Sequence, residues 1–353
     1  MRRPNPGIAS ALIAAVLFGA STPLAKALLR DVSPLLLAGL LYTGSGLGLL
    51  ILLTLRRRRA LATRPQASSL QMADLAWLAA AIAAGGVIAP VLLLLGLSRL
   101  GAAQASLLLN LEGVLTALFA WFVFRENFDR RIAIGMAAII GGGIVLSWDP
   151  AGVAGGSSGA LLVAAACALW ALDNNLTRRI SSHDALTIAC AKGLVAGVVN
   201  LSLASARGSH WPALAATAGA LLVGFVGYGI SLTLFVVALR QLGAARTGAY
   251  FSLAPFFGAA LAIALQGDPI STTLLLAGTL MAVGVWLHLT ERHVHEHTHD
   301  PLTHEHPHSH DAHHRHVHGF PWNGQEPHTH PHEHEPLVHA HGHFPDIHHR
   351  HRH

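Results

Sequence analysis

The sequence predicts an all-α polytopic membrane protein with ten transmembrane helices in an inverted five-plus-five repeat, followed by a disordered histidine-rich tail. Three observations lead to this fold class. Hydrophobic residues make up 52% of the 353 residues and charged residues only 12%, whereas a soluble domain has roughly 25% charged residues. The apolar residues come in long runs joined by short polar turns, and the two halves of the chain repeat one another.

Ten apolar runs are long enough to cross a bilayer, which requires roughly 17 to 25 predominantly apolar residues per helix. The first run is too long for the apolar segment of a typical signal peptide, so we expect it to remain as an uncleaved first helix. The predicted spans are 8–29, 34–55, 74–97, 102–124, 131–148, 159–180, 184–206, 213–239, 244–265 and 271–290.

The distribution of basic residues predicts the orientation, because cytoplasmic loops of membrane proteins are enriched in Lys and Arg. With a cytoplasmic N-terminus and an even number of spans, only Lys26, Arg30, Arg99 and Arg207 lie outside. We therefore expect a multi-pass protein of the inner membrane with both termini in the cytoplasm. The inner basic residues are Arg2, Arg3, Arg56 to Arg59, Arg64, Arg125, Arg130, Arg131, Arg178, Arg179, Arg240, Arg246 and Arg292.

Two internal echoes define the repeat. Leu100-Gly101-Ala102-Ala103-Gln104 returns as Leu242-Gly243-Ala244-Ala245-Arg246 at an offset of 142 residues (243 − 101), and Gly7 to Lys26 aligns with Gly159 to Arg178 at an offset of 152. Each half holds five spans, an odd number, so the second half enters the membrane from the opposite side, as in many secondary transporters. The predicted divisions are a first repeat at 1–148, a linker at 149–158, a second repeat at 159–290 and the tail at 291–353.

The motifs of the two halves resemble those of a known family. Leu17-Phe18-Gly19-Ala20-Ser21 opens the first helix, and its counterpart contains Ala168-Leu169-Trp170-Ala171-Leu172. The fourth span carries Asn110-Leu111-Glu112-Gly113-Val114, then Arg125-Glu126. Over roughly residues 8–290 the chain resembles the EamA-type family of the drug/metabolite transporter superfamily. In the second copy Pro255 matches the family pattern, whereas Gly113 departs from it in the first.

The resemblance implies a carrier of small metabolites, amino acids, nucleobases or drugs. It leaves the cargo unnamed, and the tail lies outside the family pattern. The lipid bilayer and a small-molecule substrate are thus the expected partners. The scattered basic residues form no continuous stripe, so no nucleic-acid partner is expected.

Glu112 is the leading candidate for a transport or coupling residue. It lies about ten residues from either end of the fourth span, near the membrane midplane, with Asn110 close by on the chain. A carboxylate at this depth is costly and is by default functional. It could take up and release a proton, or it could tie a neighbouring helix by a hydrogen bond. Both interpretations stay open.

Asp173 and Lys192 form a second candidate pair, each roughly 10 to 12 Å inside the membrane. The favoured interpretation is a buried ion pair between adjacent helices, and direct substrate contact is the alternative. Asn174 adds hydrogen-bonding capacity beside them.

Trp170 and Tyr250 could line a substrate cavity, although aromatic side chains in a helix bundle are more often packing residues. Cys167 and Cys190 lack the spacing of a zinc or redox motif. No motif brings a nucleophile, a base and an orienting group together, so no enzyme activity is expected.

The tail holds all but three of the 26 histidines. It has few apolar residues and many prolines, so it is expected to be disordered. Its histidines alternate with other residues, and alternate residues of an extended chain lie on the same side. The tail is therefore expected to bind Zn, Ni, Co or Cu, although the carrier requires no cofactor. The expected ligands are His293, His295, His297, His299, His304, His306, His308, His310, His328, His330, His332, His334, His339, His341 and His343.

Three functions remain in competition. The leading one is a secondary carrier, an exporter of small metabolites or drugs, with the tail as a metal-responsive appendage. The second is transport of a divalent metal cation such as Zn, Ni or Co, collected by the tail. The third is a membrane-anchored metal buffer or sensor that transports nothing. The sequence leaves the physiological role of metal and the oligomeric state open, with a homodimer as one alternative.

Overall fold

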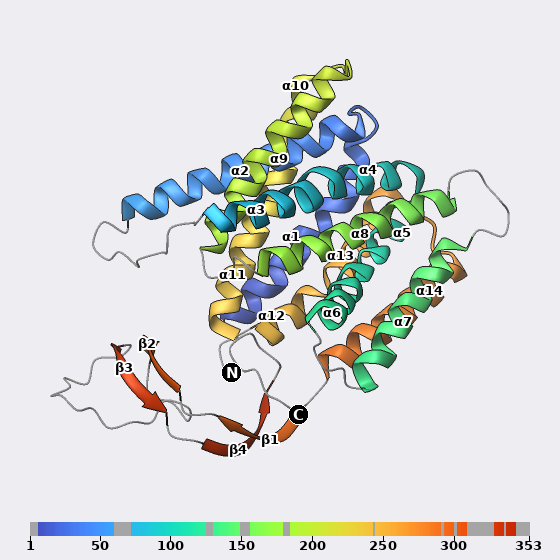
Figure 1. Ribbon diagram of the computed structural model, residues 1–353. Coiled ribbons are helices and arrows are strands. Elements are labelled where there is room, and N and C mark those ends of the chain that lie inside the picture. Colours follow the sequence, from blue (N-terminus) through green and yellow to red (C-terminus); the bar gives the residue numbers. More distant parts are fainter. Residues whose placement is uncertain are drawn as a thin grey trace. The chain divides into compact units, whose positions relative to one another are not determined.

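A computed structural model describes residues 6–59, 72–124, 130–148, 156–178, 184–242, 244–290, 293–299, 302–308, 328–334 and 337–343. The chain divides into a helical unit, Met1–Thr290, and a tail unit, Glu291–His353 (Figure 1). Several residues used above lie outside the described ones, namely Arg2, Arg3, Arg64, Arg125, Glu126, Arg179, Arg292 and His310.

The ten predicted spans are present as helices. Among the described residues, eight helical stretches are long and apolar enough to cross a membrane, and two shorter apolar helices follow at Ala254–Gln266 and Thr272–His288. The first half consists of α1 (Pro6–Leu28), α2 (Pro34–Arg59), α3 (Met72–Ala81), η1 (Ile82–Ile88), α4 (Ala89–Arg99), α5 (Ala102–Leu108), α6 (Asn110–Phe124) and α7 (Arg130–Ser147).

The second half repeats this order. It consists of α8 (Gly156–Arg178), α9 (Ala185–Ala206), α10 (Leu214–Gly224), η2 (Phe225–Ile230), α11 (Ser231–Leu242), α12 (Ala244–Phe251), α13 (Ala254–Gln266) and α14 (Thr272–Leu289).

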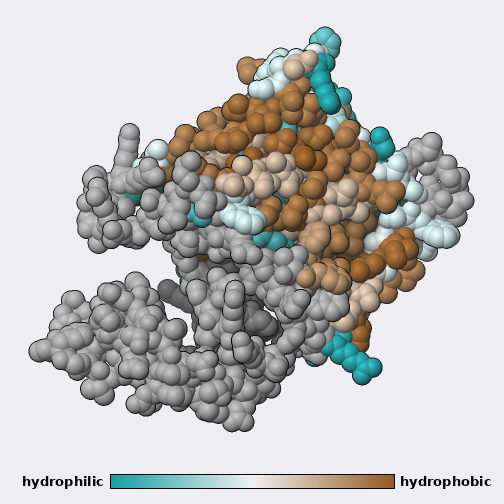
Figure 2. All heavy atoms as spheres, in the orientation of Figure 1, coloured by the Kyte–Doolittle hydropathy of each residue, from teal (hydrophilic) through white to brown (hydrophobic). Residues whose placement is uncertain are grey.

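The outside of the helical unit is apolar. Ile51 is 58% exposed, Leu161 68% and Leu222 60%, and Figure 2 shows a mostly hydrophobic face with hydrophilic residues gathered near its extremities. Exposed apolar area of this extent marks a surface that contacts something other than water. Lipid tails satisfy that requirement, and this confirms the predicted multi-pass membrane protein.

The packing of the helices follows the repeat. α2 packs against α9 and α7 against α14, so helices of equal rank from the two halves meet each other. The contact of α4 with α8 is matched by that of α11 with α1, and the contact of α6 with α8 by that of α13 with α1. Each of these contacts between a helix of the first half and a helix of the second thus has an equivalent contact in which the two halves have changed places.

The α2–α9 pair also shows the inversion. Gly46 of α2 lies against Leu194, whereas Gly39, seven residues earlier, lies against Leu201, seven residues later. Residue numbers thus rise along one helix as they fall along the other, so the two helices are antiparallel. Equivalent helices of the two halves must run in opposite directions in an inverted repeat.

Four helical discontinuities occur at equivalent places in the two halves. The third and eighth spans contain the π-helical segments η1 and η2. The fourth span is interrupted at Leu109, between α5 and α6, and the ninth at Ser252 and Leu253, between α12 and α13. Interrupted helices are tolerated at membrane depth only where protein or a water-filled cavity surrounds the freed backbone groups.

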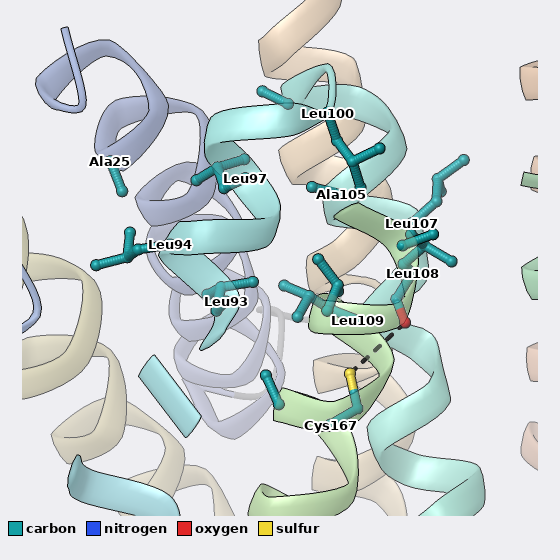
Figure 3. Close-up of a cluster of buried hydrophobic side chains, with 14 of the residues drawn as sticks. Ala25, Leu93, Leu94, Leu97, Leu100, Ala105, Leu107, Leu108, Leu109 and Cys167 are labelled. Atoms are coloured by element: carbon teal, nitrogen blue, oxygen red, sulfur yellow. Dashed lines mark hydrogen bonds between the residues drawn. The ribbon is translucent and has the colours of Figure 1, made fainter. Parts of the chain in front are cut away.

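The main apolar core lies around α4, α5 and α8. Leu93, Leu94 and Leu97 of α4 and Leu108 of α5 are nearly inaccessible, and Figure 3 shows the helix with Leu93, Leu94 and Leu97 beside the segment that carries Leu107, Leu108 and Leu109. There the Cys167 thiol donates to the carbonyl of Leu108 at 3.7 Å (Figure 3). This cysteine is therefore a packing residue that also satisfies a freed carbonyl.

The described parts of the tail unit are four short strands. Four seven-residue strands are described, β1 (His293–His299), β2 (Leu302–His308), β3 (His328–His334) and β4 (Leu337–His343). β1 pairs with β4 and β2 with β3, both antiparallel. The alternation of His with other residues has the two-residue period of a β-strand.

The contact between α2 and α9 yields a stability prediction. A Cβ added to Gly46 would lie 2.6 Å from the Leu194 amide nitrogen, so Gly46→Ala is expected to lower the free energy of unfolding by about 1–3 kcal/mol through overpacking. A Cβ on Gly141 meets nothing within 4 Å, so Gly141→Ala is expected to leave stability unchanged or raise it, as Ala favours helix. Melting temperatures in detergent measure both, and equal effects would contradict the close approach.

Candidate functional site

The carbonyl of Gly85, in η1, anchors two aromatic side chains from other helices. It accepts hydrogen bonds from the Tyr42 hydroxyl at 2.8 Å and from the Trp170 indole nitrogen at 2.9 Å. Beside it, the carbonyl of Gly86 accepts from the buried Asn200 amide at 3.2 Å. A π-helical turn loosens the regular backbone hydrogen bonding and is frequent at functional sites. Here its carbonyls hold α2, α8 and α9 together.

Aromatic rings extend from this point across the two halves. The Tyr42 and Tyr228 rings have centroids 6.1 Å apart, and Phe18 lies 5.8 Å from Tyr228 and 5.3 Å from Phe251. We call Tyr42, Tyr228, Phe18 and Phe251 the aromatic wall. Tyr228 belongs to η2 and Tyr42 binds the Gly85 carbonyl of η1, so the wall connects the two π-helical segments. Phe18 is the repeat counterpart of Trp170 at the offset of 152.

Asp173 and Lys192 form the ion pair expected between α8 and α9. The Lys192 ammonium lies 2.5 and 2.6 Å from the two carboxylate oxygens of Asp173, and the side chains are 18% and 8% exposed. The Thr177 hydroxyl donates to Asp173 at 2.9 Å, and Lys192 donates to that hydroxyl at 3.3 Å. The negative charge of Asp173 is thus neutralised within the protein.

Glu112 has a different environment. Its carboxylate accepts a hydrogen bond from the Asn174 amide at 3.0 Å, and the same amide lies 3.2 Å from the Thr116 hydroxyl. Glu112 is half-buried and Asn174 exposed. Among the described side chains, no Lys, Arg or His forms an ion pair with Glu112. Its only direct side-chain partner in this part of the chain is a neutral donor.

These two networks meet on α8, because Asp173 and Asn174 are consecutive. We call Glu112, Thr116, Asp173, Asn174, Thr177 and Lys192 the central polar cluster. Glu112 is linked to this helix by its hydrogen bond with Asn174, the neighbour of Asp173. The cluster therefore combines a neutralised ion pair with one carboxylate that lacks a cation.

The cluster draws residues from both halves, and the positions that correspond to its carboxylates carry no charge. At the offsets of the repeat, Asp173 and Asn174 correspond to Ser21 and Thr22, and Glu112 corresponds to Ala254. The packing around them is nevertheless equivalent. A Cβ on Gly85 would meet the Asp173 side chain, and one on Gly227 would meet Ser21. The fold is pseudo-symmetric, whereas the two carboxylates have no charged counterparts at the symmetry-related positions.

Two of the predicted site residues lie elsewhere. Asn110 is 7% exposed, and its amide donates to the Leu107 carbonyl at 2.9 Å and contacts the Met281 sulfur at 3.9 Å. It therefore satisfies a carbonyl at the break before α6 and packs against α14. Tyr250 is half-buried in α12, and no hydrogen bond described for the helical unit joins its side chain to the cluster.

Three site residues were missed by the sequence reasoning: Tyr42, Thr116 and Thr177. The threonines had a detectable signal, since each follows a candidate carboxylate by four residues, Thr116 after Glu112 and Thr177 after Asp173, which places them on the same helix face. Tyr42 had none, because its partner is a backbone carbonyl of another helix.

Hydrogen bonds between helices close one end of the helical unit. The Lys26 ammonium of α1 donates to the Leu97 carbonyl of α4 at 2.6 Å, and the Gln266 amide of α13 donates to the Pro23 carbonyl of α1. Asp268 accepts from the Ala103 amide at the start of α5 at 2.7 Å. A pocket of about 320 Å³ lies among Lys26, Arg30, Ser98, Gln266 and Asp268. In the predicted orientation this is the outer end.

Metal ligands do not gather in the helical unit as far as it is described. Among the residues whose side chains the structure describes, no three His, Cys, Asp or Glu residues lie together in a group that could hold a metal ion.

Comparison with known proteins identifies the family. Residues 5–148 and 157–290 each match the EamA-like transporter family. An uncharacterized transporter of Methanothermobacter thermautotrophicus is 30% identical over 294 residues, 80% of this chain and 85% of that protein. This chain is also 41% identical over 80 residues to the probable 4-amino-4-deoxy-L-arabinose-phosphoundecaprenol flippase subunit ArnE of Pseudomonas fluorescens. That alignment covers 23% of this chain and 69% of the ArnE protein.

A protein of known crystal structure shares the fold, with a TM-score of 0.57 at 20% identity, over 79% of this chain and 95% of that chain. The family match covers both halves of the helical unit. The alignment with the Methanothermobacter transporter runs over 80% of this chain. The chain therefore belongs to the EamA-like transporter family and is a multi-pass membrane transporter built from two EamA repeats.

Proposed function

We propose that this transporter is a secondary carrier that exports small organic solutes across the inner membrane, with both termini in the cytoplasm and Glu112 as the coupling residue. The observation that carries the proposal is the contrast between two carboxylates in one cluster. Asp173 is neutralised by Lys192, whereas Glu112 contacts a neutral amide.

The contrast separates the roles of the two carboxylates. A proton binding to Asp173 would leave the Lys192 charge without its partner, which is costly away from water. A proton binding to Glu112 removes an unpaired charge from membrane depth, where such charges cost several kcal/mol. Glu112 is therefore the carboxylate that exchanges a proton at the lower cost, and exchange of an inward-moving proton for a solute drives export.

The aromatic wall supports an organic cargo. Tyr42, Tyr228 and Phe18 present apolar ring surface, and Asn174, which is exposed, presents an amide beside Glu112. Ligand sites typically combine an apolar lining with a few placed polar groups. A small solute with an apolar body and one polar or cationic group suits this combination.

Alternating access follows from the repeat. The four discontinuities divide the third, fourth, eighth and ninth spans at equivalent levels, and inverted repeats exchange conformations around a midplane site. We propose that the contacts of Lys26 and Gln266 with α4 and α1 form the closed outer gate, and that they break when the site opens outward.

Replacing Glu112 tests the coupling role. Purified protein in proteoliposomes with an entrapped pH dye is exposed to a panel of amino acids, nucleobases and small drugs. We expect active solutes to evoke proton movement with the native protein. Glu112→Gln is expected to abolish that movement while labelled solute still exchanges across the membrane, because the cavity persists without the titrating group. Glu112→Asp, which keeps a carboxylate, is the matched control and should retain part of the signal.

Full proton movement with Glu112→Gln would show that another group couples transport. Loss of solute exchange together with proton movement would instead assign Glu112 to cargo binding.

The ion pair offers a separate prediction. Asp173→Asn leaves the Lys192 charge buried without a counter-charge, so we expect it to lower the free energy of unfolding by about 3–5 kcal/mol. Asp173→Leu combined with Lys192→Met removes both charges and should recover most of that loss. Melting temperatures compare the variants. If the double variant folds but has lost all solute exchange, the pair contacts the substrate and is not only structural.

The gate is tested by labelling from outside. In Lys26→Met and Gln266→Met the donors to Leu97 and Pro23 are lost. We expect a membrane-impermeant maleimide to reach a cysteine introduced at Thr116 faster in both variants, with about tenfold more outward-open protein for each 1.4 kcal/mol of lost closure. Arg30→Met is the control, since Arg30 lines the same pocket without a hydrogen bond to another helix in the described structure. Equal labelling rates in all variants would remove these contacts from the gate.

A further inference from the structure

The two strand ladders of the tail share one register. In both, residue n lies opposite residue 636 − n, as His293 lies opposite His343 and Leu302 opposite His334. The two ladders thus share one arrangement, in which the earlier strands β1 and β2 pair with the later strands β4 and β3. Segments up to 50 residues apart (343 − 293) are paired in this way.

The register places histidine opposite histidine. Residues directly opposite each other in an antiparallel pair share a face of the ribbon, and so do alternate residues of one strand. Each ladder thus has one face with seven histidine positions. Six of them form three cross-strand pairs, and the seventh, His299 or His334, lies opposite a leucine. The pairs are His293 with His343, His295 with His341 and His297 with His339 in the first ladder, and His304 with His332, His306 with His330 and His308 with His328 in the second.

The same register separates acidic residues from these histidines. Glu296, Glu305 and Glu333 stand at the alternate positions of their strands. They belong to the other face of each ribbon. The histidine faces therefore offer imidazole nitrogen as the donor type, which suits Zn, Ni, Co and Cu and does not suit Mg or Ca.

We propose that each ladder is a metal-binding ribbon, in which two neighbouring histidine pairs bind one divalent borderline metal ion, so that one chain binds two ions through its tail. Opposite Cβ atoms in an antiparallel pair are about 4.5–5.5 Å apart, and alternate residues of a strand about 6.6 Å apart. Four imidazoles on this spacing can converge on a single ion at about 2.0–2.1 Å per Zn–N bond.

The ion also closes the ribbon. An isolated two-stranded ribbon is at best marginally stable in water, and pairing strands this distant in sequence adds a loop-closure cost that rises slowly with length. A metal bound by both strands supplies the missing free energy, because binding to a site that exists only in the paired state is coupled to folding. Metal occupancy of the tail and pairing of its strands are therefore one event. The carrier's substrate has no part in this inference.

A register shift tests the ribbon without removing a single histidine. One alanine inserted between Ala340 and His341 moves His341 and His343 to the other face relative to His339, since a one-residue slip reverses the faces. In the purified full-length protein titrated with Zn²⁺ or Ni²⁺, we expect one of the two ions to bind at least about tenfold more weakly, since even outer-shell partners of a metal site are worth that much. The other ion, in the β2–β3 ladder, should bind as before.

Two controls complete the titration. The same alanine inserted after Pro345, outside the strands, should leave both affinities unchanged. An alanine inserted between Thr329 and His330 should weaken the second ion and spare the first. If all three insertions bind metal like the native chain, the tail is a chelator without register and the ribbon is overturned.

Strand pairing has its own readout. Spin labels on cysteines introduced at Thr298 and Val338, which lie opposite each other, should move from a broad distance distribution to a single short one when Zn²⁺ is added. Metal binding without this change would equally overturn the proposal, because it would separate occupancy from pairing.

Discussion

The absence of water from the bilayer core is the constraint on which the rest of the helical unit depends. A broken helix at membrane depth frees carbonyls that only the protein can satisfy. Each break in the first half is matched by donors from other positions: Tyr42 and Trp170 at the Gly85 carbonyl, Asn200 at Gly86, and Cys167 at Leu108. Interrupted helices are therefore stable in the membrane only where such side chains donate to the freed carbonyls.

The same requirement explains why the candidate site lies where it does. Donors to the η1 carbonyls come from α2, α8 and α9, and the helices they tie together carry Asp173, Lys192 and Asn174. A polar cluster is stable in this place because its members satisfy one another or the interrupted backbone. Glu112 is the exception, since a neutral amide is its only direct side-chain partner in the described structure. That difference from Asp173 is the basis of the coupling role proposed for Glu112.

Hydropathy and internal repetition were sufficient to predict the ten spans and the repeat, because each depends only on the order of residue types along the chain. The Asp173–Lys192 pair was also foreseeable, since two opposite charges at one depth on adjacent helices have few other partners. The π-helical segments and the role of Tyr42 were not, because they depend on how neighbouring helices rotate. The partner of Asn110 was not predictable for a similar reason, because its amide donates to the Leu107 carbonyl of its own interrupted helix.

The absence of charge at the symmetry-related positions Ser21 and Ala254 is compatible with a symmetric mechanism. α2 and α9 pack against each other as equal-ranking helices, so they lie at the axis that relates the halves. Lys192 of the cluster belongs to α9, which places the ion pair beside that axis. A second set of carboxylates at Ser21 and Ala254 would add like charges at membrane depth and raise the cost of burying them. One carboxylate and one ion pair near the axis can therefore serve both the inward-open and the outward-open state.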